Sequence, residues 1–266
     1  MGRRLKLEIA YHGQLFHGWQ KQRDQRTVQG ELHEALTRIL RGHQLSVVGA
    51  SRTDTGVHAA GQVAHLDLPG PIPPDALIRG LNSRLPRQIR VLSARPVPGT
   101  FHARKSALGK LYTYRARWRE PRLPWFEPRS ATVTTISDFE SFSAALDLFV
   151  GRHDWASFTV PNPETESTTR TLFGVRFRHR RKGIDVDFLG EGFLRYLVRR
   201  MVGALLEIGS GDRHVDELRE LIENPSPGSP IRTAPAQGLC LEHIYYRKCP
   251  AVTGAQSPTK SSGTLS

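Results

Sequence analysis

The sequence predicts an α+β fold of two ferredoxin-like units in tandem, joined into one extended antiparallel sheet with helices on one face and a central cleft. Two observations lead to this prediction. Strand-like and helix-like hydrophobic patterns follow one another in the order β-α-β-β-α-β, and the same order then occurs a second time. The units are expected at residues 1–105 and 106–248. Residues 249–266 are rich in Ser, Thr, Gly and Pro, and are expected to form a disordered tail.

The first unit opens on a strand in which Leu5, Leu7 and Ile9 alternate with polar residues. A helix is expected next, because Thr27 is a favourable N-cap and apolar residues recur at helical spacing from Val28 onward. The predicted elements of this unit are strand 3–10, helix 27–41, strand 45–50, strand 61–68, helix 74–84 and strand 88–97.

The second unit repeats this order. Ser137 and Glu140 have the spacing of a capping box, which predicts that Ser137 caps a helix. Lys182 and Gly183 predict a turn between two strands. The predicted elements are strand 107–118, helix 138–149, strand 171–180, strand 184–189, helix 193–208, a short helix 214–222, a Pro/Gly-rich connection 224–235 and strand 239–247.

The charge of the chain indicates a polyanionic partner. The sequence has 38 Lys and Arg against 25 Asp and Glu, a formal net charge of +13. Such an excess favours nucleic acid binding, although a merely soluble basic surface remains the alternative when charge alone is considered. The arginines gather in three groups, of which one alternates along a predicted strand. The groups are Arg115, Arg117, Arg119 and Arg122; Arg176, Arg178, Arg180, Arg181 and Lys182; and Arg195, Arg199 and Arg200.

Cysteine and histidine usage gives no indication of a metal or a disulfide framework. Cys240 and Cys249 are too few for either, so a reducing cytoplasm is the simpler expectation. The 11 histidines are scattered and contain no HExxH pattern, so we expect no metal. The N-terminal residues form a strand pattern, and neither a signal peptide nor a membrane span is expected.

The most informative segment is residues 51–60, SRTDTGVHAA, which lies between two apolar runs. It places Asp54 two positions after Arg52, on a predicted turn whose Gly56 lets the backbone approach a ligand. A strand-turn-strand unit of this kind can present one ionised carboxylate to a substrate. The alternative is that Asp54 only hydrogen-bonds its own turn.

The longer string SRTDTGVHAAGQV resembles the GRTDAGVHAxGQV signature of the A family of tRNA pseudouridine synthases. Further similarities to that family's motifs occur in the same order at residues 11–29, 85–91, 101–114, 193–203 and 234–239, so the resemblance extends from about residue 5 to 246. The chain departs from the motifs at four positions. Ser51 stands for the usual Gly, Thr55 for Ala, His12 for Asp and Gln88 for Asp.

The resemblance implies a role for each of five residues. Asp54 would be the nucleophile, and Arg199 the cation that pairs with it and keeps it ionised. Tyr112 would stack on the target uracil, Leu239 would line the pocket, and Arg52 would fill the space left by the flipped nucleotide and hold its phosphate. From the sequence alone Arg199 is equally a surface helix residue, and Tyr112 and Leu239 are ordinary strand and core residues.

The implied activity is the isomerisation of uridine to pseudouridine at tRNA positions 38 to 40, in the anticodon arm. The reaction adds no group and changes no oxidation state, so no cofactor is expected. The family also implies a homodimer in which each tRNA is held by both subunits. Two other classes stay open: an RNA-binding module of the RRM type, and a metal-free nuclease or GTP-binding protein. Neither an RNP1 string nor a Walker A string is present.

Overall fold

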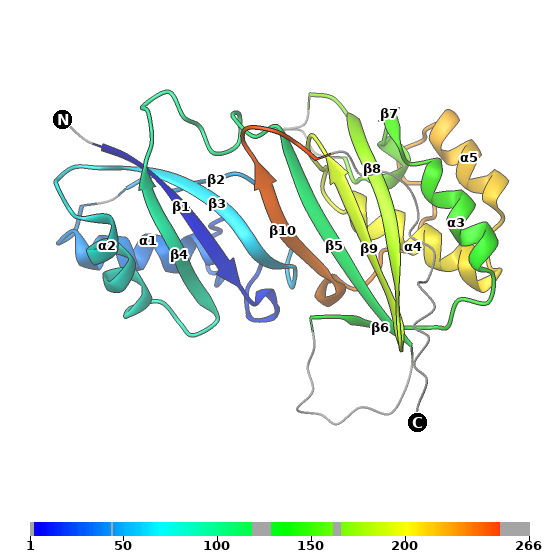
Figure 1. Cartoon of the computed structure of the whole chain (residues 1–266), viewed down its shortest axis with the longest axis horizontal. Helices are drawn as coiled ribbons and strands as arrows, with labels where there is room; N and C mark the ends of the chain where they lie inside the picture. Colours follow the sequence, from blue (N-terminus) through cyan, green and yellow to red (C-terminus); the bar gives the residue numbers. More distant parts are fainter. Residues whose placement is uncertain (1–2, 44, 119–128, 162–165, 251–266) are drawn as a thin grey trace, which may run out of the picture.

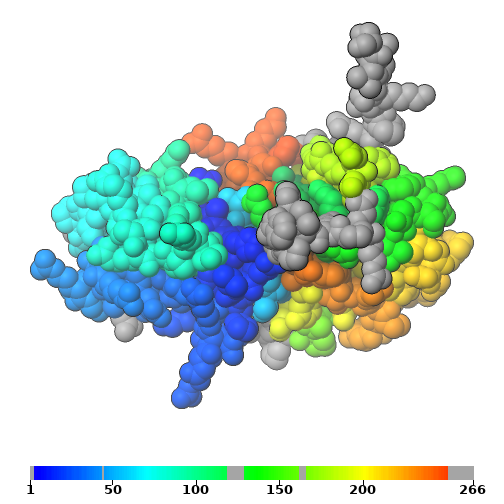
Figure 2. All heavy atoms as spheres, turned by 90° about the horizontal axis from the view of Figure 1, so that it is seen from below, coloured from blue at the N-terminus to red at the C-terminus, as the bar shows by residue number. Residues whose placement is uncertain are grey.

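The computed structural model describes residues 3–43, 45–118, 129–161 and 166–250. The tail expected from residue 249 therefore falls almost wholly outside the described residues, as do Arg119 and Arg122. Within the described residues ten strands form one sheet, which runs the length of the molecule (Figure 1). Seen from below, the first half (blue to cyan) and the second half (green to orange) lie side by side (Figure 2).

The first half has the predicted order of elements. Strand β1 buries Leu5, Leu7, Ile9 and Tyr11 on one face, as its alternation predicts. The N-cap is also as predicted, because the hydroxyl of Thr27 accepts a hydrogen bond from the Gly30 amide. The elements are β1 (Arg3–Tyr11), the 3-10 turn η1 (Gly13–Leu15), α1 (Val28–Ile39), β2 (Val48–Gly49), β3 (His58–Leu68), α2 (Pro74–Asn82) and β4 (Ile89–Pro96).

The second half repeats the order and adds two short strands. Those additions are β6 and β7, which pair with β5 and β8 at the margins of the sheet. The elements are β5 (Gly109–Trp118), β6 (Ala131–Val133), α3 (Phe139–Asp147), β7 (Gly151–Asp154), η2 (Ala156–Phe158), β8 (Thr169–Arg180), β9 (Gly183–Gly190), α4 (Leu197–Ser210), α5 (Val215–Glu223), η3 (Ala236–Gly238) and β10 (Leu239–Tyr245).

The order of strands in the sheet is the same in both halves. The sheet runs β4-β1-β3-β10-β5-β9-β8-β7, with β2 paired to β3. The order β4-β1-β3-β2 of the first half is thus matched by β10-β5-β9-β8 in the second. Helices α1 and α2 lie behind the strands of the first half and α4 behind those of the second (Figure 1). The two ferredoxin-like units predicted from the sequence are confirmed.

The joint between the halves differs from the prediction of a purely antiparallel sheet. Strand β10 pairs with β3 in parallel, through Cys240 with His58 and Leu241 with Ala59, so the sheet is mixed. Each unit is antiparallel within its main ladders, but the edge strands that meet at the joint run in the same direction. The joint begins four residues after Asp54, and it therefore determines how the first half faces the second at that aspartate.

Three of the predicted boundaries differ from the structure at places where a residue makes a long-range contact. The strand expected at 45–50 is only Val48–Gly49, and the Val47 carbonyl just before it accepts a hydrogen bond from the Gln29 side chain of α1. Asp138, not Ser137, caps α3, because the Ser137 hydroxyl donates to the Gly209 carbonyl instead. The helix expected from 193 begins at Leu197, after a turn whose Arg195 carbonyl accepts from the Thr159 hydroxyl.

Candidate active site

The turn that carries Asp54 is held from both sides. The amide of Trp19 donates to the Thr53 carbonyl over 3.1 Å, and the Tyr11 hydroxyl lies 2.8 Å from the Thr53 hydroxyl. Gly18 has a φ of +83°, and a Cβ there would press on the same Thr53 carbonyl, so a glycine is required at this approach. The backbone on either side of Asp54 is therefore fixed by the first half of the protein.

The second half supplies the cation beside Asp54. Arg199, on the first turn of α4, places Nη1 3.5 Å from Oδ2 of Asp54, and the two side chains are 15% and 19% exposed. The Nε of Arg199 donates to the Ala234 carbonyl over 2.8 Å, which orients the guanidinium. That carbonyl belongs to a segment that crosses α4 closely, because a Cβ at Gly203 would overlap the Arg232 carbonyl.

Burial raises the pKa of Asp54 above its ordinary value, although several groups act in the opposite direction. The charges of Arg199 and Arg195 lower it, and so do hydrogen bonds from the Arg199 side chain and the Tyr196 backbone. The positive end of the α4 dipole also favours a carboxylate at this place. The sequence-based expectation that Arg199 compensates Asp54 thus describes part of the balance, because the guanidinium offsets the desolvation only partly.

All five residues singled out from the sequence line one pocket. It is narrow, with a volume of about 30 Å³, and it opens into a wider cavity of about 400 Å³ that shares Arg52, Asp54 and Arg199 with it. The five residues are Arg52, Asp54, Tyr112, Arg199 and Leu239, which come from the Asp54 turn, β5, α4 and the start of β10. The structure brings them together, while their individual roles stay predictions.

Tyr112 is fixed in this pocket through contacts of both its hydroxyl and its ring. Tyr112 is 5% exposed, and its hydroxyl lies 2.9 Å from the Ser51 hydroxyl. Phe193 meets its ring edge-on, with ring centroids 5.1 Å apart. Burial raises the pKa of Tyr112, so its hydroxyl remains protonated. The departure from Gly to Ser at position 51 therefore supplies a hydrogen-bond partner to Tyr112.

Sequence reasoning did not place several further residues in the site, although Arg195 was part of one arginine group. Phe193, Arg195 and Tyr196 lie in the turn before α4, and Lys110 lies at the start of β5. Tyr196 has a φ of +64°, a left-handed conformation that is uncommon for an aromatic residue. The first three belong to the 193–203 motif, but their positions there looked helical. No local pattern shows that they leave the helix and face Asp54.

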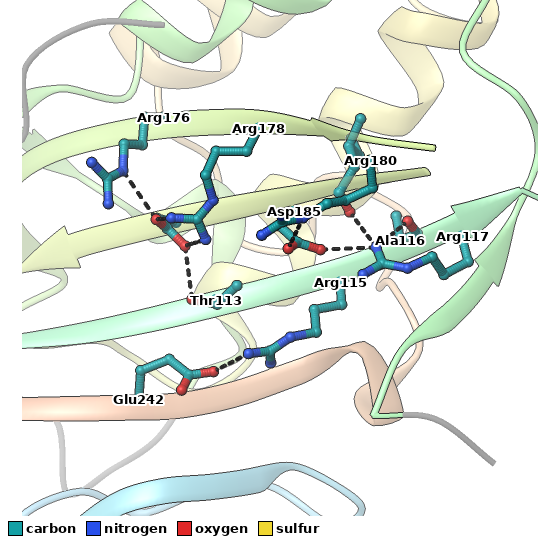
Figure 3. Close-up of polar contacts among 11 residues, drawn as sticks. Thr113, Arg115, Ala116, Arg117, Arg176, Arg178, Arg180, Asp185 and Glu242 are labelled. Carbon is teal, nitrogen blue, oxygen red and sulfur yellow. Dashed lines mark hydrogen bonds and ion pairs between the residues drawn. The ribbon is translucent and has the colours of Figure 1, made fainter. Parts of the chain in front are cut away.

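The described arginines of two groups lie mostly on the other face of the sheet. Tyr112 lines the pocket, so the alternating residues Thr113, Arg115 and Arg117 of β5 point away from it. There the arginines meet two buried carboxylates, Asp185 and Asp187, and the half-buried Glu242 (Figure 3). The ion pairs are Arg115 with Glu242, Arg117 and Arg180 with Asp185, and Arg176 and Arg178 with Asp187. Much of the positive charge expected to contact RNA is thus paired within the protein.

The described residues contain no group of three or more His, Cys, Asp or Glu side chains arranged to hold a metal ion. No helix among them has the length and apolarity needed to cross a membrane.

The fold and the site define a class of protein: a tandem ferredoxin-like protein with an arginine-paired aspartate between its halves. Comparison with known proteins gives the family. The model of the family described as tRNA pseudouridine synthase matches residues 9–104 and 145–247, and the chain belongs to this family. Proteins named tRNA pseudouridine synthase A are similar over nearly the whole chain. That of Lactobacillus helveticus is 40% identical over 92% of this chain and 95% of its own length. That of Syntrophotalea carbinolica is 40% identical over 94% and 99%.

Proposed function

We propose that this protein isomerises uridine to pseudouridine at positions 38 to 40 of the tRNA anticodon arm, with Asp54 as the catalytic carboxylate. Membership of the tRNA pseudouridine synthase family supports the reaction and the substrate. The observation that carries the proposal is the placement of Asp54. It is a mostly buried carboxylate, paired with Arg199, at the place where a narrow pocket opens into a cavity lined by cationic side chains.

The chemistry explains what each part of the site is for. The glycosidic bond from N1 to C1′ breaks, the uracil turns, and a bond from C5 to C1′ forms; C5 loses a proton and N1 gains one. A carboxylate can start this by attack on C1′, by addition to C6 of the base, or through a glycal route, and all three need Asp54 ionised. Arg199 favours that ionised form. The aromatic face of Tyr112 offers a surface to the detached ring, and Leu239 closes the pocket beside it.

Arg52 fits the assignment of holding the phosphate of the flipped nucleotide. It is exposed and lines both the narrow pocket and the wider cavity. Extrusion of a base from its stack costs a few kcal/mol, which a guanidinium on the displaced phosphate helps to offset.

The proposal includes cytoplasmic location and a homodimer in which both subunits hold each tRNA. Light scattering of the purified protein, alone and with tRNA, tests the dimer.

The decisive experiment is release of tritium from tRNA carrying uridine labelled at C5. Wild-type protein should release tritium, because formation of the C5 to C1′ bond expels that hydrogen. Asp54→Asn keeps the shape of the side chain and removes its charge, so it should bind tRNA with nearly the wild-type affinity and release none. Residual turnover within about tenfold of wild type, which is about 1.4 kcal/mol in the barrier, would refute the assignment of Asp54.

A further inference from the structure

Lys110 is a mostly buried lysine in the wall of the wider cavity, and among the described residues no carboxylate pairs with it. Its side chain belongs to β5 on the same face as Tyr112, two residues further along, and it is 7% exposed. Among the described residues no hydrogen bond or ion pair reaches its Nζ. Burial lowers the pKa of Lys110 to about 8, and the charges of Arg104 and Arg170 act in the same direction.

Two further cations accompany Lys110 in the wall of the 400 Å³ cavity, away from the narrow pocket. Arg170 is oriented by backbone carbonyls, since its Nη1 donates to Ser167 over 2.9 Å and to Thr169 over 2.5 Å. Arg104 lies in an exposed turn before β5. Within the described residues neither has a carboxylate at ion-pair distance. Their mutual repulsion raises the free energy of the empty cavity.

The opposite face of the same strand shows the contrast. There Arg115 pairs with Glu242 and Arg117 with Asp185, so that each β5 cation has a carboxylate (Figure 3). A largely buried cation with no such partner is destabilising unless solvent or a ligand compensates its charge. One mostly buried and two more exposed cations in one cavity wall, none paired with a carboxylate among the described residues, indicate an anionic ligand.

We propose that Lys110, Arg104 and Arg170 form a second phosphate subsite, which binds a backbone phosphate of the RNA strand next to the nucleotide held at Asp54. The inference rests on the proposed function, because it takes RNA as the occupant of the cavity. The subsite lies in the same cavity as Arg52, so one strand can engage both. A phosphodiester suits the place, because it presents two anionic oxygens to donors that approach from different elements.

The test compares Lys110→Met, which keeps the length of the side chain and removes its charge, with Lys110→Arg, which keeps the charge. Lys105→Met is the matched control. It removes one charge from an exposed lysine that lies in the turn of Arg104 and does not line the cavity. Binding of tRNA is measured against salt concentration. In Lys110→Met the slope of log K against log salt should become shallower by about 0.7 to 0.9, the loss of one phosphate contact. Lys110→Arg should keep the wild-type slope.

Turnover gives a second readout. A phosphate contact made equally in the ground state and the transition state contributes to KM and not to kcat. Lys110→Met should therefore raise KM at least about tenfold and change kcat less than about threefold, whereas Lys105→Met should change both less than about twofold. The melting temperature of free Lys110→Met should stay equal or rise, since the change removes an uncompensated buried charge.

Three results would overturn the proposal. One is a salt slope and KM for Lys110→Met that match those of Lys105→Met. Another is a melting temperature that falls in Lys110→Met and recovers in Lys110→Arg, which would make Lys110 a structural residue.

The third result comes from inorganic phosphate at constant ionic strength, which tests a free anion as ligand. A rise in melting temperature that Lys110→Met abolishes would assign the site to the free ion and overturn the RNA phosphate. If wild-type protein releases no tritium, the proposed function fails, and the salt dependence of tRNA binding still decides the subsite.

Discussion

The ionisation of Asp54 depends on two opposing effects, burial and the neighbouring positive charges. Burial raises the pKa of Asp54, and Arg199 is the strongest of the groups that lower it. The guanidinium is available for this because its Nε is bonded to the Ala234 carbonyl, while its Nη1 faces the carboxylate. Since the proposed reaction needs the carboxylate form, the pKa of Asp54 sets the acid limit of activity.

Arg199→Leu should move that limit to higher pH. Removal of the guanidinium raises the pKa of Asp54 further, so the carboxylate form, which is lost as the pH falls through the pKa, is lost at a higher pH. We expect kcat at neutral pH to fall by at least about a hundredfold, or roughly 3 kcal/mol, with a smaller change in affinity for tRNA. A pH profile of kcat/KM measures the shift.

Arg219→Leu is the control, since Arg219 is an exposed arginine on α5 that lines neither cavity. Its profile should coincide with that of the wild type. An acid limit that stays in place in Arg199→Leu would show that Arg199 does not govern the ionisation of Asp54.

Strands β8 and β9 form a hairpin whose charges are paired across it. Asp187 of β9 is 3% exposed and meets the Nε of Arg176 at 3.0 Å, Nη1 of Arg178 at 2.9 Å and the Thr113 hydroxyl at 2.7 Å. Asp185 lies between Arg180 and Arg117 in the same way. These arginines hold carboxylates that would otherwise be buried without partners.

Joint replacement of Arg178, Arg180 and Arg181 by Gln should therefore lower the free energy of unfolding, by about 1–3 kcal/mol. It should leave the salt dependence of tRNA binding unchanged, because the first two arginines are engaged within the sheet on the face away from Asp54. Urea unfolding and salt titrations of binding measure the two effects. Arg181→Gln alone, at an exposed residue of the turn, is the control for stability. A flatter salt slope with unchanged stability would place this face on the RNA path.

At the scale of the whole molecule, the candidate active site depends on the contact between two halves. Asp54 and Arg52 come from the first half, while Tyr112, Arg199 and Leu239 come from the second. The direct backbone pairing between the halves is the short parallel ladder of β3 and β10. Gly61 lies in this ladder region, and a Cβ there would overlap the Glu242 carbonyl.

Gly61→Ala should force β3 and β10 apart and so separate Asp54 from its partners. We expect a lower melting temperature, equivalent to about 1–3 kcal/mol, together with a reduced kcat. Gly70→Ala is the matched control, since a Cβ at Gly70 meets no atom within 4 Å. Calorimetry and tritium release measure the two effects. A Gly61→Ala protein with a lower melting temperature but unchanged kcat would show that the site tolerates movement at the joint.

Features that depend on near neighbours in the chain could be predicted from the sequence alone. The cap at Thr27 and the alternation of Leu5, Leu7 and Ile9 are of this kind, because caps and periodicity involve residues a few positions apart. Local patterns of this kind along both halves predicted the order of elements and hence the tandem fold. The motif around Asp54 was equally local, and it indicated the site and the family.

The tertiary structure decided what depends on partners far away in the chain. Ser137 has the pattern of a cap but bonds to Gly209, and the turn before α4 looks helical but bonds to Thr159. In the sequence the arginines of β8 look like unpaired charges, and only the structure shows the carboxylates of β9 beside them. Lys110 looks like an ordinary strand lysine, and only the structure shows that it is mostly buried with no carboxylate beside it among the described residues. A sequence lists donors and charges, whereas long-range packing determines which of them become paired, buried or left for a ligand.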